Sequence, residues 1–387
     1  MVIVVLMLCS FAVATAEFVL VGLLPEIATD LAVSVPAAGQ LVTVYMLVVT
    51  VGGPVATVLT RRLPRRSLLA ATMALATAAA TGSAAAGSYG VLLVARLGSA
   101  VAQALFMAVA SQVAMAAAAP TRQTAAVARV FAGFALATVI GLPVGSLVGQ
   151  AYGWHATFVL VAALAGTGLV GVLVFCPRIP ADASADPGRL GDVVRLLAPR
   201  AVLTGLAVTL LTLTGFVAVF TYVAPLLSTV AGFSPGWVSV ALVGYGLGTV
   251  AGNVLAGRVA PAAVPGVLPV PLAVLAVVLS AQPVLLRIPA TALVGLVVLG
   301  AATFVVVPLL QTWLMAQVGQ AAAGLVAAVN ISVAGVAGAL GAGLGGAVLA
   351  VGLGLVAIGP VAALPVLGAL AAALALRARP AGALCRD

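Results

Sequence analysis

The chain has 387 residues, of which 64% are hydrophobic and only 6% are charged. A soluble globular protein carries about 25% charged residues, so this composition excludes a water-soluble fold and predicts a protein embedded in the lipid bilayer. The net charge of +9 comes from 16 basic residues, all of them arginine. Basic loops set the orientation of membrane proteins, and we therefore expect no nucleic-acid partner.

Hydrophobic segments separated by short breaks predict an all-α membrane protein with twelve transmembrane helices in two pseudo-symmetric halves. The expected spans are 3–24, 38–59, 67–86, 91–115, 125–149, 156–176, 201–226, 236–257, 264–281, 290–315, 323–349 and 352–376. The expected domains are an N-terminal six-helix half (1–176), a cytoplasmic linker (177–200), a C-terminal six-helix half (201–376) and a cytoplasmic tail (377–387).

The first predicted helix contains Glu17, the only carboxylate within any membrane-length segment. A charge in the bilayer costs roughly 2.5–3.5 kcal/mol on insertion scales, and burial favours the neutral acid. Glu17 is therefore a candidate proton carrier. The alternative is a protonated side chain that only hydrogen-bonds a neighbouring helix. Residues 14–16 resemble a signal-peptidase site, but no Arg or Lys precedes them, so we expect this segment to remain a helix.

The fourth predicted helix contains Arg96, the only arginine within a span. Arginine keeps its proton in proteins, so Arg96 must face polar partners or a water-filled cavity. The alternative is a side chain that reaches back to the outer interface. Gln103 follows seven residues later on the same helix face. If Glu17 and Arg96 pair, a substrate that binds between them would release a proton.

The distribution of arginine predicts the orientation. With the amino terminus inside, 14 of the 16 arginines fall on the cytoplasmic side, which is a strong positive-inside signal. We expect a multi-pass protein of the bacterial plasma membrane with both termini in the cytoplasm.

Glycine is regularly spaced in two helices. The repeated positions are Gly141, Gly145 and Gly149 in the fifth helix and Gly341 and Gly345 in the eleventh. Such stripes let helices approach closely, and Pro143 is expected to kink the fifth helix. An offset of 196 residues relates Gly145 and Gly149 to Gly341 and Gly345, as expected for duplicated halves around a midplane site. The stripes could serve static packing or form a sliding surface between the halves.

Few side chains could line a substrate cavity. The candidates are Tyr45, Met46, Gln103, Phe220, Tyr222 and Asn330. Each also fits ordinary packing, and a ligand would meet mainly apolar and aromatic surface. The chain has no phosphate-binding loop, no paired catalytic carboxylates, no Ser/His/Asp set and no cysteine or histidine spacing for a metal. We therefore expect no catalytic residues, no cofactor and no metal, and a transporter driven by an ion gradient. An enzyme or a passive scaffold is disfavoured.

Several motifs carry a family resemblance. These are Thr15-Ala16-Glu17-Phe18 followed by Gly22-Leu23-Leu24-Pro25, then Arg96 with Gln103, then Gly141-Leu142-Pro143-Val144-Gly145 with Gly149 and Gly153-Trp154, and Phe220-Thr221-Tyr222-Val223-Ala224-Pro225. Over nearly its whole length the chain resembles the major facilitator superfamily, and within it the twelve-helix drug:proton antiporters of the chloramphenicol-exporter and arabinose-efflux branch.

The resemblance implies exchange of protons for a small amphipathic compound, such as chloramphenicol, that leaves the cell by alternating access. Glu17 and Arg96 would couple the proton, the glycine stripes would serve conformational change, and the protein would act as a monomer. The alternative on the same fold is efflux of sugars or other small metabolites, although hydroxyl-binding residues are scarce.

The sequence departs from the family pattern at two places. The loop after the second helix would form a cytoplasmic gate from Arg61, Arg62, Arg65 and Arg66. The family usually has an Asp and a Gly in this loop, at the places of Arg61 and Pro64, so only the basic cluster remains. His155 stands where the branch more often has an arginine.

Overall fold

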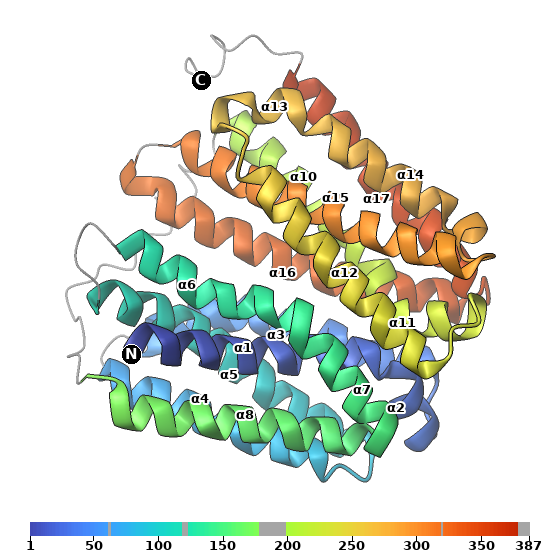
Figure 1. Cartoon of the computed structure of the whole chain (residues 1–387). Coiled ribbons are helices and arrows are strands. Elements are labelled where there is room, and N and C mark those ends of the chain that lie inside the picture. Colours follow the sequence, from blue (N-terminus) through green and yellow to red (C-terminus); the bar gives the residue numbers. More distant parts are fainter. Residues whose placement is uncertain (61–62, 118–122, 178–198, 319, 378–387) are drawn as a thin grey trace. The chain divides into compact units, whose positions relative to one another are not determined.

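The computed structural model describes residues 1–60, 63–117, 123–177, 199–318 and 320–377. The chain is helical over these residues (Figure 1). Arg61 and Arg62, most of the predicted linker and most of the predicted tail lie outside them. Packing divides the chain into two compact units. The first unit holds α1 to α8 together with Pro235–Val240, the first turns of α12, and the second holds the rest of α12 and the remaining helices.

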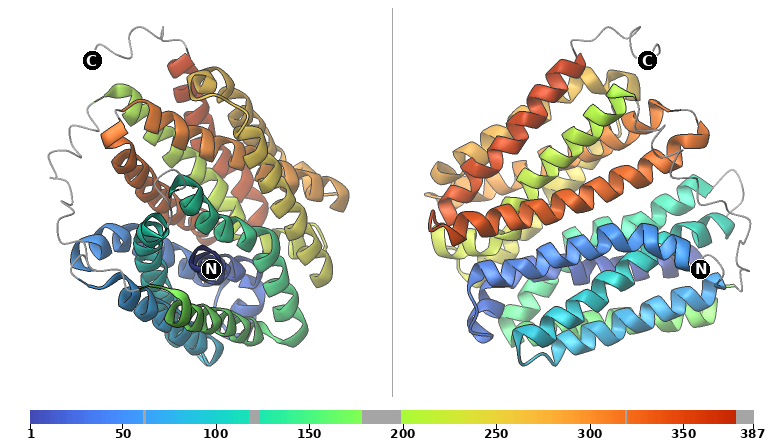
Figure 2. Two further views of the ribbon diagram at one scale, coloured as in Figure 1. Left: turned by 60° about the vertical axis from the view of Figure 1, so that its left-hand side comes forward. Right: turned by 180° about the vertical axis from the view of Figure 1, so that it is seen from behind.

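The helices of the first unit are α1 (Val2–Gly22), α2 (Leu24–Asp30), α3 (Val35–Thr60), α4 (Arg65–Ala84), α5 (Tyr89–Ala116), α6 (Gln123–Leu136), the π-helical turn η2 (Ala137–Gly141), α7 (Leu142–Tyr152) and α8 (Trp154–Phe175). Helix α1 packs against α4, α5, α6, α7 and α8, while α4 and α8 run side by side (Figures 1 and 2). An apolar core that includes Leu6, Met73, Phe106 and Val172 joins α1, α4, α5, α6 and α8.

The helices of the second unit are α10 (Arg200–Thr221), α11 (Val223–Pro225), the π-helical turn η3 (Leu226–Val230), α12 (Pro235–Ala256), the 3-10 turn η4 (Pro261–Ala263), α13 (Val264–Val267), α14 (Pro269–Leu285), α15 (Pro289–Ala316), α16 (Gln320–Ala350), the 3-10 turn η5 (Leu355–Ala357) and α17 (Ile358–Arg377). Helix α10 packs on α16 and α17, and α14 packs on α15 and α17.

Proline marks many of the breaks between helices. Pro25, Pro235 and Pro289 stand in the first turn of α2, α12 and α15, where a missing N–H leaves no hydrogen bond unmade. Each of the two π-helical turns lies beside a proline, η2 just before Pro143 and η3 directly after Pro225. Proline removes a backbone donor, and π turns are often found at functional sites.

Among the described residues, eleven helices are long and apolar enough to cross a bilayer. The number rises to twelve if two segments bent by 42°, Pro261–Val267 and Pro269–Leu285, form one span. The sequence predicts one helix over residues 264–281 there. The structure instead starts the span earlier and bends it, because several prolines in this segment leave carbonyl groups without donors.

Candidate functional site

Glu17 lies within the first unit, on the buried side of α1. Only 8% of its surface is exposed. The adjacent Ala16 packs against Ala80 of α4 and Val161 of α8. The apolar sequence of α1 would bury this carboxylate without a partner, and an unpaired charge at such a position is costly. The partner comes from α5.

Gln103 connects Glu17 to Tyr45. Its amide Nε2 donates a hydrogen bond to Glu17 Oε2 at 2.5 Å, and its Oε1 accepts one from the Tyr45 hydroxyl at 2.6 Å. Gln103 is 3% exposed and Tyr45 is 1% exposed. Three helices, α1, α3 and α5, therefore meet in one buried hydrogen-bonded chain. We call Glu17, Gln103, Tyr45 and Arg96 together the Glu17 network.

Arg96 completes the Glu17 network from the same face of α5. Its side chain is 2% exposed, and its Nη1 donates a hydrogen bond to the Ala16 carbonyl, next to Glu17. The guanidinium carbon lies 4.3 Å from the centre of the Tyr45 ring, in cation–π geometry. The positive charge acts on Glu17 electrostatically. Within the described residues, Arg96 Nε is buried without a hydrogen-bond partner.

The Glu17 network can hold two charge states. With Glu17 ionised, the carboxylate and the guanidinium compensate each other. When Glu17 takes up a proton, the buried positive charge of Arg96 loses this compensation, which is costly in a region of low dielectric constant. The arrangement can therefore tie the binding of a proton to the arrival or departure of another polar group.

The other predicted residues of the first unit lie on packing surfaces. Met46 is partly buried in α3. The glycine stripe of η2 and α7 faces α1: a Cβ atom added at Gly141, Gly145 or Gly149 would overlap Thr15, Val19 or Leu23, respectively. Thr15 and Val19 lie four residues apart on α1, and Leu23 follows directly after its end, so the stripe packs along one row that flanks Glu17.

Of the predicted gate loop, the structure describes Arg65 and Arg66. Arg65 is buried, and the Arg66 guanidinium donates a hydrogen bond to the carbonyl of Leu173 near the end of α8. Such a contact satisfies a free carbonyl of the last helical turn. Cys176 follows α8, and burial raises the pKa of its thiol.

The predicted residues of the second unit form a separate set. Phe220 stacks with Phe216 and lies 4.7 Å from the ring of Tyr245, measured between ring centres. The Tyr222 hydroxyl is directed at the Ala342 carbonyl, 3.5 Å away. The stripe of α16 lies on α10, because a Cβ atom at Gly345 would lie 2.6 Å from Tyr222 Cε2 and one at Gly341 would overlap the Thr214 carbonyl.

A second buried polar cluster surrounds Asn330. Thr209 Oγ1 donates a hydrogen bond to Asn330 Oδ1 at 2.8 Å, and Asn330 Nδ2 donates one to Gln311 Oε1. Asn330 is among the predicted substrate residues, whereas Thr209 and Gln311 are not. In the sequence, Thr209 and Gln311 stand out only as polar residues within apolar helices, and this pattern does not identify the residues they contact.

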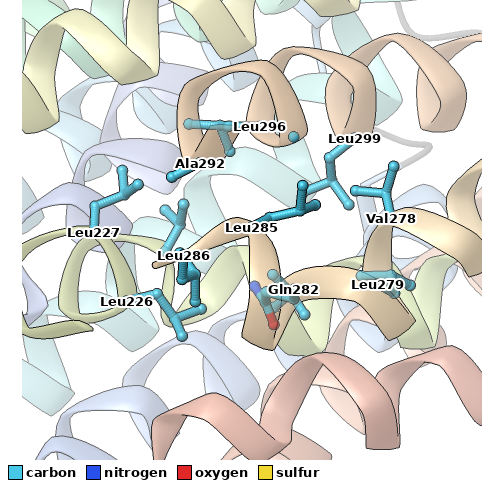
Figure 3. A pocket seen from close by; sticks show the side chains of 13 residues that line it. Leu226, Leu227, Val278, Leu279, Gln282, Leu285, Leu286, Ala292, Leu296 and Leu299 are labelled. Atoms are coloured by element: carbon cyan, nitrogen blue, oxygen red, sulfur yellow. The ribbon is translucent and has the colours of Figure 1, made fainter. Parts of the chain in front are cut away.

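A small apolar cavity of about 40 Å³ lies within the second unit, between η3, α14 and α15 (Figure 3). Its lining is leucine, valine, alanine and glycine apart from Gln282, whose Oε1 is buried without a partner among the described residues. The lining does not include the predicted substrate residues.

Two acidic side chains lie on α2, beyond the first apolar span. Asp30 Oδ2 accepts a hydrogen bond of 2.9 Å from the Trp154 indole, and His155 stacks on Trp154 with 3.6 Å between ring centres. Glu26 Oε2 is buried with no partner among the described residues, and burial raises the pKa of this carboxyl group above its usual value.

The long apolar helices are those of a multi-pass helical membrane protein. The buried Glu17 network places ionisable side chains among these helices. The sequence pattern of the Major Facilitator Superfamily matches residues 6–342. The chain belongs to the major facilitator superfamily, a family of transporters of small molecules, which confirms the predicted family and the all-α fold class.

Relatives with curated names give a consistent picture. The chain is 36% identical over 320 residues to the inner membrane transport protein YdhP of Escherichia coli (strain K12), covering 83% of this chain and 81% of YdhP. It is 38% identical over 250 residues to a chloramphenicol resistance protein of Streptomyces lividans, covering 64% of this chain and 63% of that protein. The solved structure of the nucleoside transporter NupG matches with a TM-score of 0.79 at 12% identity over 97% of this chain and 100% of NupG, which shows the shared fold.

Proposed function

We propose that this transporter exports a small amphipathic compound, such as chloramphenicol, in exchange for protons. The observation that carries the proposal is the buried carboxyl group of Glu17, which has an amide donor and a nearby guanidinium within the same unit. An ionisable group at membrane depth is a functional candidate by default. The relative named as a chloramphenicol resistance protein supports the substrate class.

The proposed cycle exchanges the two cargoes at the Glu17 network. Glu17 takes up a proton while the substrate is absent, and binding of the substrate near Arg96 favours the ionised carboxylate and releases the proton. One proton that moves through 100 mV supplies about 2.3 kcal/mol. That free energy equals a concentration ratio of roughly fifty for a neutral substrate, which is enough to keep a drug level low.

The direction of transport follows from the proposed orientation. Fourteen of the 16 arginines would lie on the cytoplasmic side if both termini are inside. Protons then enter from outside along their gradient while the compound leaves the cell.

Transport by the purified protein in lipid vesicles tests the proposal. A pH gradient should drive uptake of chloramphenicol by the wild type and not by Glu17→Gln. The same variant should still equilibrate the drug down its own gradient, because a neutral amide keeps the shape of the protonated acid. Glu26→Gln is the matched control, since it removes an acid outside the Glu17 network, and it should transport like the wild type. Gradient-driven uptake by Glu17→Gln would exclude Glu17 as the proton carrier.

Sugar or metabolite efflux is the second candidate function. The cluster of Thr209, Gln311 and Asn330 offers amide and hydroxyl groups of the kind that bind sugar hydroxyls. These groups already hydrogen-bond one another, so we rank this function second. Uptake assays with a panel of drugs and a panel of sugars in the same vesicles distinguish the two functions.

A further inference from the structure

Among the residues that the structure describes, Gln103 is the one side chain that hydrogen-bonds both Glu17 and Tyr45. Its two amide atoms have opposite roles: Nε2 donates to Glu17 Oε2 at 2.5 Å, and Oε1 accepts from the Tyr45 hydroxyl at 2.6 Å. All three side chains are buried, so water cannot easily replace a lost partner, and a buried polar group without a partner is costly.

The ionised form of Glu17 fixes the orientation of this amide. A carboxylate only accepts hydrogen bonds, whereas an amide donates through nitrogen and accepts through oxygen. Gln103 must therefore turn its nitrogen to Glu17 and its oxygen to Tyr45. The hydroxyl of Tyr45 is the only adaptable member, because it can donate or accept.

A proton on Glu17 Oε2 reverses these requirements. The carboxyl O–H then faces the amide N–H, and two donors meet. A half-turn of the amide about its terminal bond places Oε1 toward Glu17 and Nε2 toward Tyr45. The Tyr45 oxygen then accepts a hydrogen bond, and its hydrogen loses the acceptor it had.

We propose that Gln103 is a positioning residue whose amide turns over when Glu17 takes up a proton, so that the protonation state of Glu17 reaches the Tyr45 hydroxyl. The inference rests on the proposed role of Glu17 as the proton carrier. The ring of Tyr45 covers the Arg96 guanidinium at 4.3 Å. When the Tyr45 hydroxyl loses its acceptor, the Tyr45 ring that covers the Arg96 guanidinium is held less firmly. Proton uptake by Glu17 therefore changes the surroundings of the Arg96 charge.

The surroundings of Glu17 leave few other groups to account for such a pH response. Arg96 from α5 and Tyr45 from α3 act on the network electrostatically. Cys9 on α1 lies eight residues before Glu17, about 12 Å along the axis. The other ionisable residues described on helices packed against α1 stand near helix ends or on exposed surface; they are Arg65, Arg66, Tyr89, Arg129, Tyr152 and His155.

Chloramphenicol-driven proton release rises and then falls with pH, and the midpoint of this curve, the pH of greatest release, measures the coupling in purified protein. Gln103→Met keeps the length of the side chain and removes the amide. The charge-assisted hydrogen bond that favours the ionised carboxylate is then lost, so the midpoint should rise by about one pH unit. Gln282→Met is the matched control, because it removes a partly buried amide in the second unit, and its midpoint should equal that of the wild type.

Tyr45→Phe provides the coupling test. It should shift the midpoint in the wild-type background and add little in the Gln103→Met background, because the path from Glu17 to Tyr45 is already broken. Equal shifts in both backgrounds would overturn the proposal, and so would an unchanged midpoint in Gln103→Met. If either of these outcomes is found while Glu17→Gln releases no protons, only the role of Gln103 is rejected and the proposed proton exchange stands. If Glu17→Gln releases protons like the wild type, the proposed exchange at Glu17 is rejected.

Infrared spectroscopy extends the test to wild-type protein in case Gln103→Met does not fold. Glutamine labelled with ¹³C at the side-chain carbonyl should show one amide band that shifts when the protein is titrated through Glu17 protonation. The shift should vanish in Glu17→Gln and remain in Gln282→Met. A glutamine spectrum that does not change with pH would overturn the proposal.

Discussion

The close approach of α7 to α1 gives a prediction that can be worked out from atomic positions. Gly145 faces Val19 across this interface, and Val19 is fully buried. A Cβ atom at position 145 would overlap Val19 Cγ2, so Gly145→Ala forces the two helices apart or strains them. Inserting a methyl group into a packed core costs about 1–3 kcal/mol, and we expect Gly145→Ala to destabilise the protein by this amount.

The matching change on α1 should rescue the variant. If Val19→Ala removes both methyl groups of Val19, the nearest remaining neighbours of the new Cβ atom are Thr157 Cγ2 at 3.2 Å and Val19 Cβ at 3.4 Å. Such distances require a shift of only a few tenths of an ångström. In the wild-type background Val19→Ala should itself be destabilising, by roughly 1–2 kcal/mol for the methyl groups it removes. The effect of Val19→Ala should therefore change sign between the two backgrounds.

Thermal unfolding of the detergent-solubilised protein measures this sign change. Cys9 and Cys176 are free and buried, so a thiol-reactive dye reports unfolding in a Cys385→Ser background. Gly343→Ala is the control, because a Cβ atom there would meet no other atom within 4 Å, and its unfolding temperature should match that of the background. If Val19→Ala lowers the unfolding temperature equally with and without Gly145→Ala, the two helices do not pack as described.

Three further variants test other parts of the structure. Arg96→Lys should abolish proton-driven uptake while the protein still inserts and folds. An ammonium group cannot reproduce the planar contact with Tyr45 while it reaches the Ala16 carbonyl. Normal uptake by this variant would show that Arg96 is not needed for proton coupling. Glu26 has a pKa raised by burial, so the folded protein holds this proton more tightly than the unfolded chain and its stability falls as pH rises through the folded pKa. Glu26→Gln should flatten that fall in a series of thermal scans, and an unchanged pH dependence would contradict the burial. Arg66→Gln should lower the unfolding temperature slightly by freeing the Leu173 carbonyl, a loss of about 1 kcal/mol; no change would show that water replaces this bond.

The sequence was sufficient for the fold and for the individual ionisable residues. Apolar length predicts helices because the bilayer leaves few other choices, and Glu17 and Arg96 stand out in apolar segments. The hydrogen-bond partners of Glu17 and Arg96 could not be predicted, since Glu17 and Gln103 are 86 residues apart and only the relative register of α1 and α5 brings them together. The predicted substrate roles of Tyr45 and Gln103 stay predictions, although both side chains already bond within the Glu17 network.

The spacing of the glycines predicts more of the structure than the number of glycines does. The offset of 196 residues that relates Gly145 to Gly341 and Gly149 to Gly345 predicts duplicated halves. In each unit the stripe packs against the first long helix, α1 or α10. The bend between α13 and α14 was missed because hydropathy averages over the prolines that cause it. The predicted domain boundaries at residues 176 and 200 stay predictions.

Proton release upon drug binding tests the central claim most directly. Chloramphenicol is added to purified protein in weakly buffered detergent solution, and the pH is followed with an indicator dye. The wild type should release protons in proportion to the drug bound, and Glu17→Gln should bind the drug without releasing any. Equal proton release from both proteins would contradict the exchange of proton and substrate at Glu17.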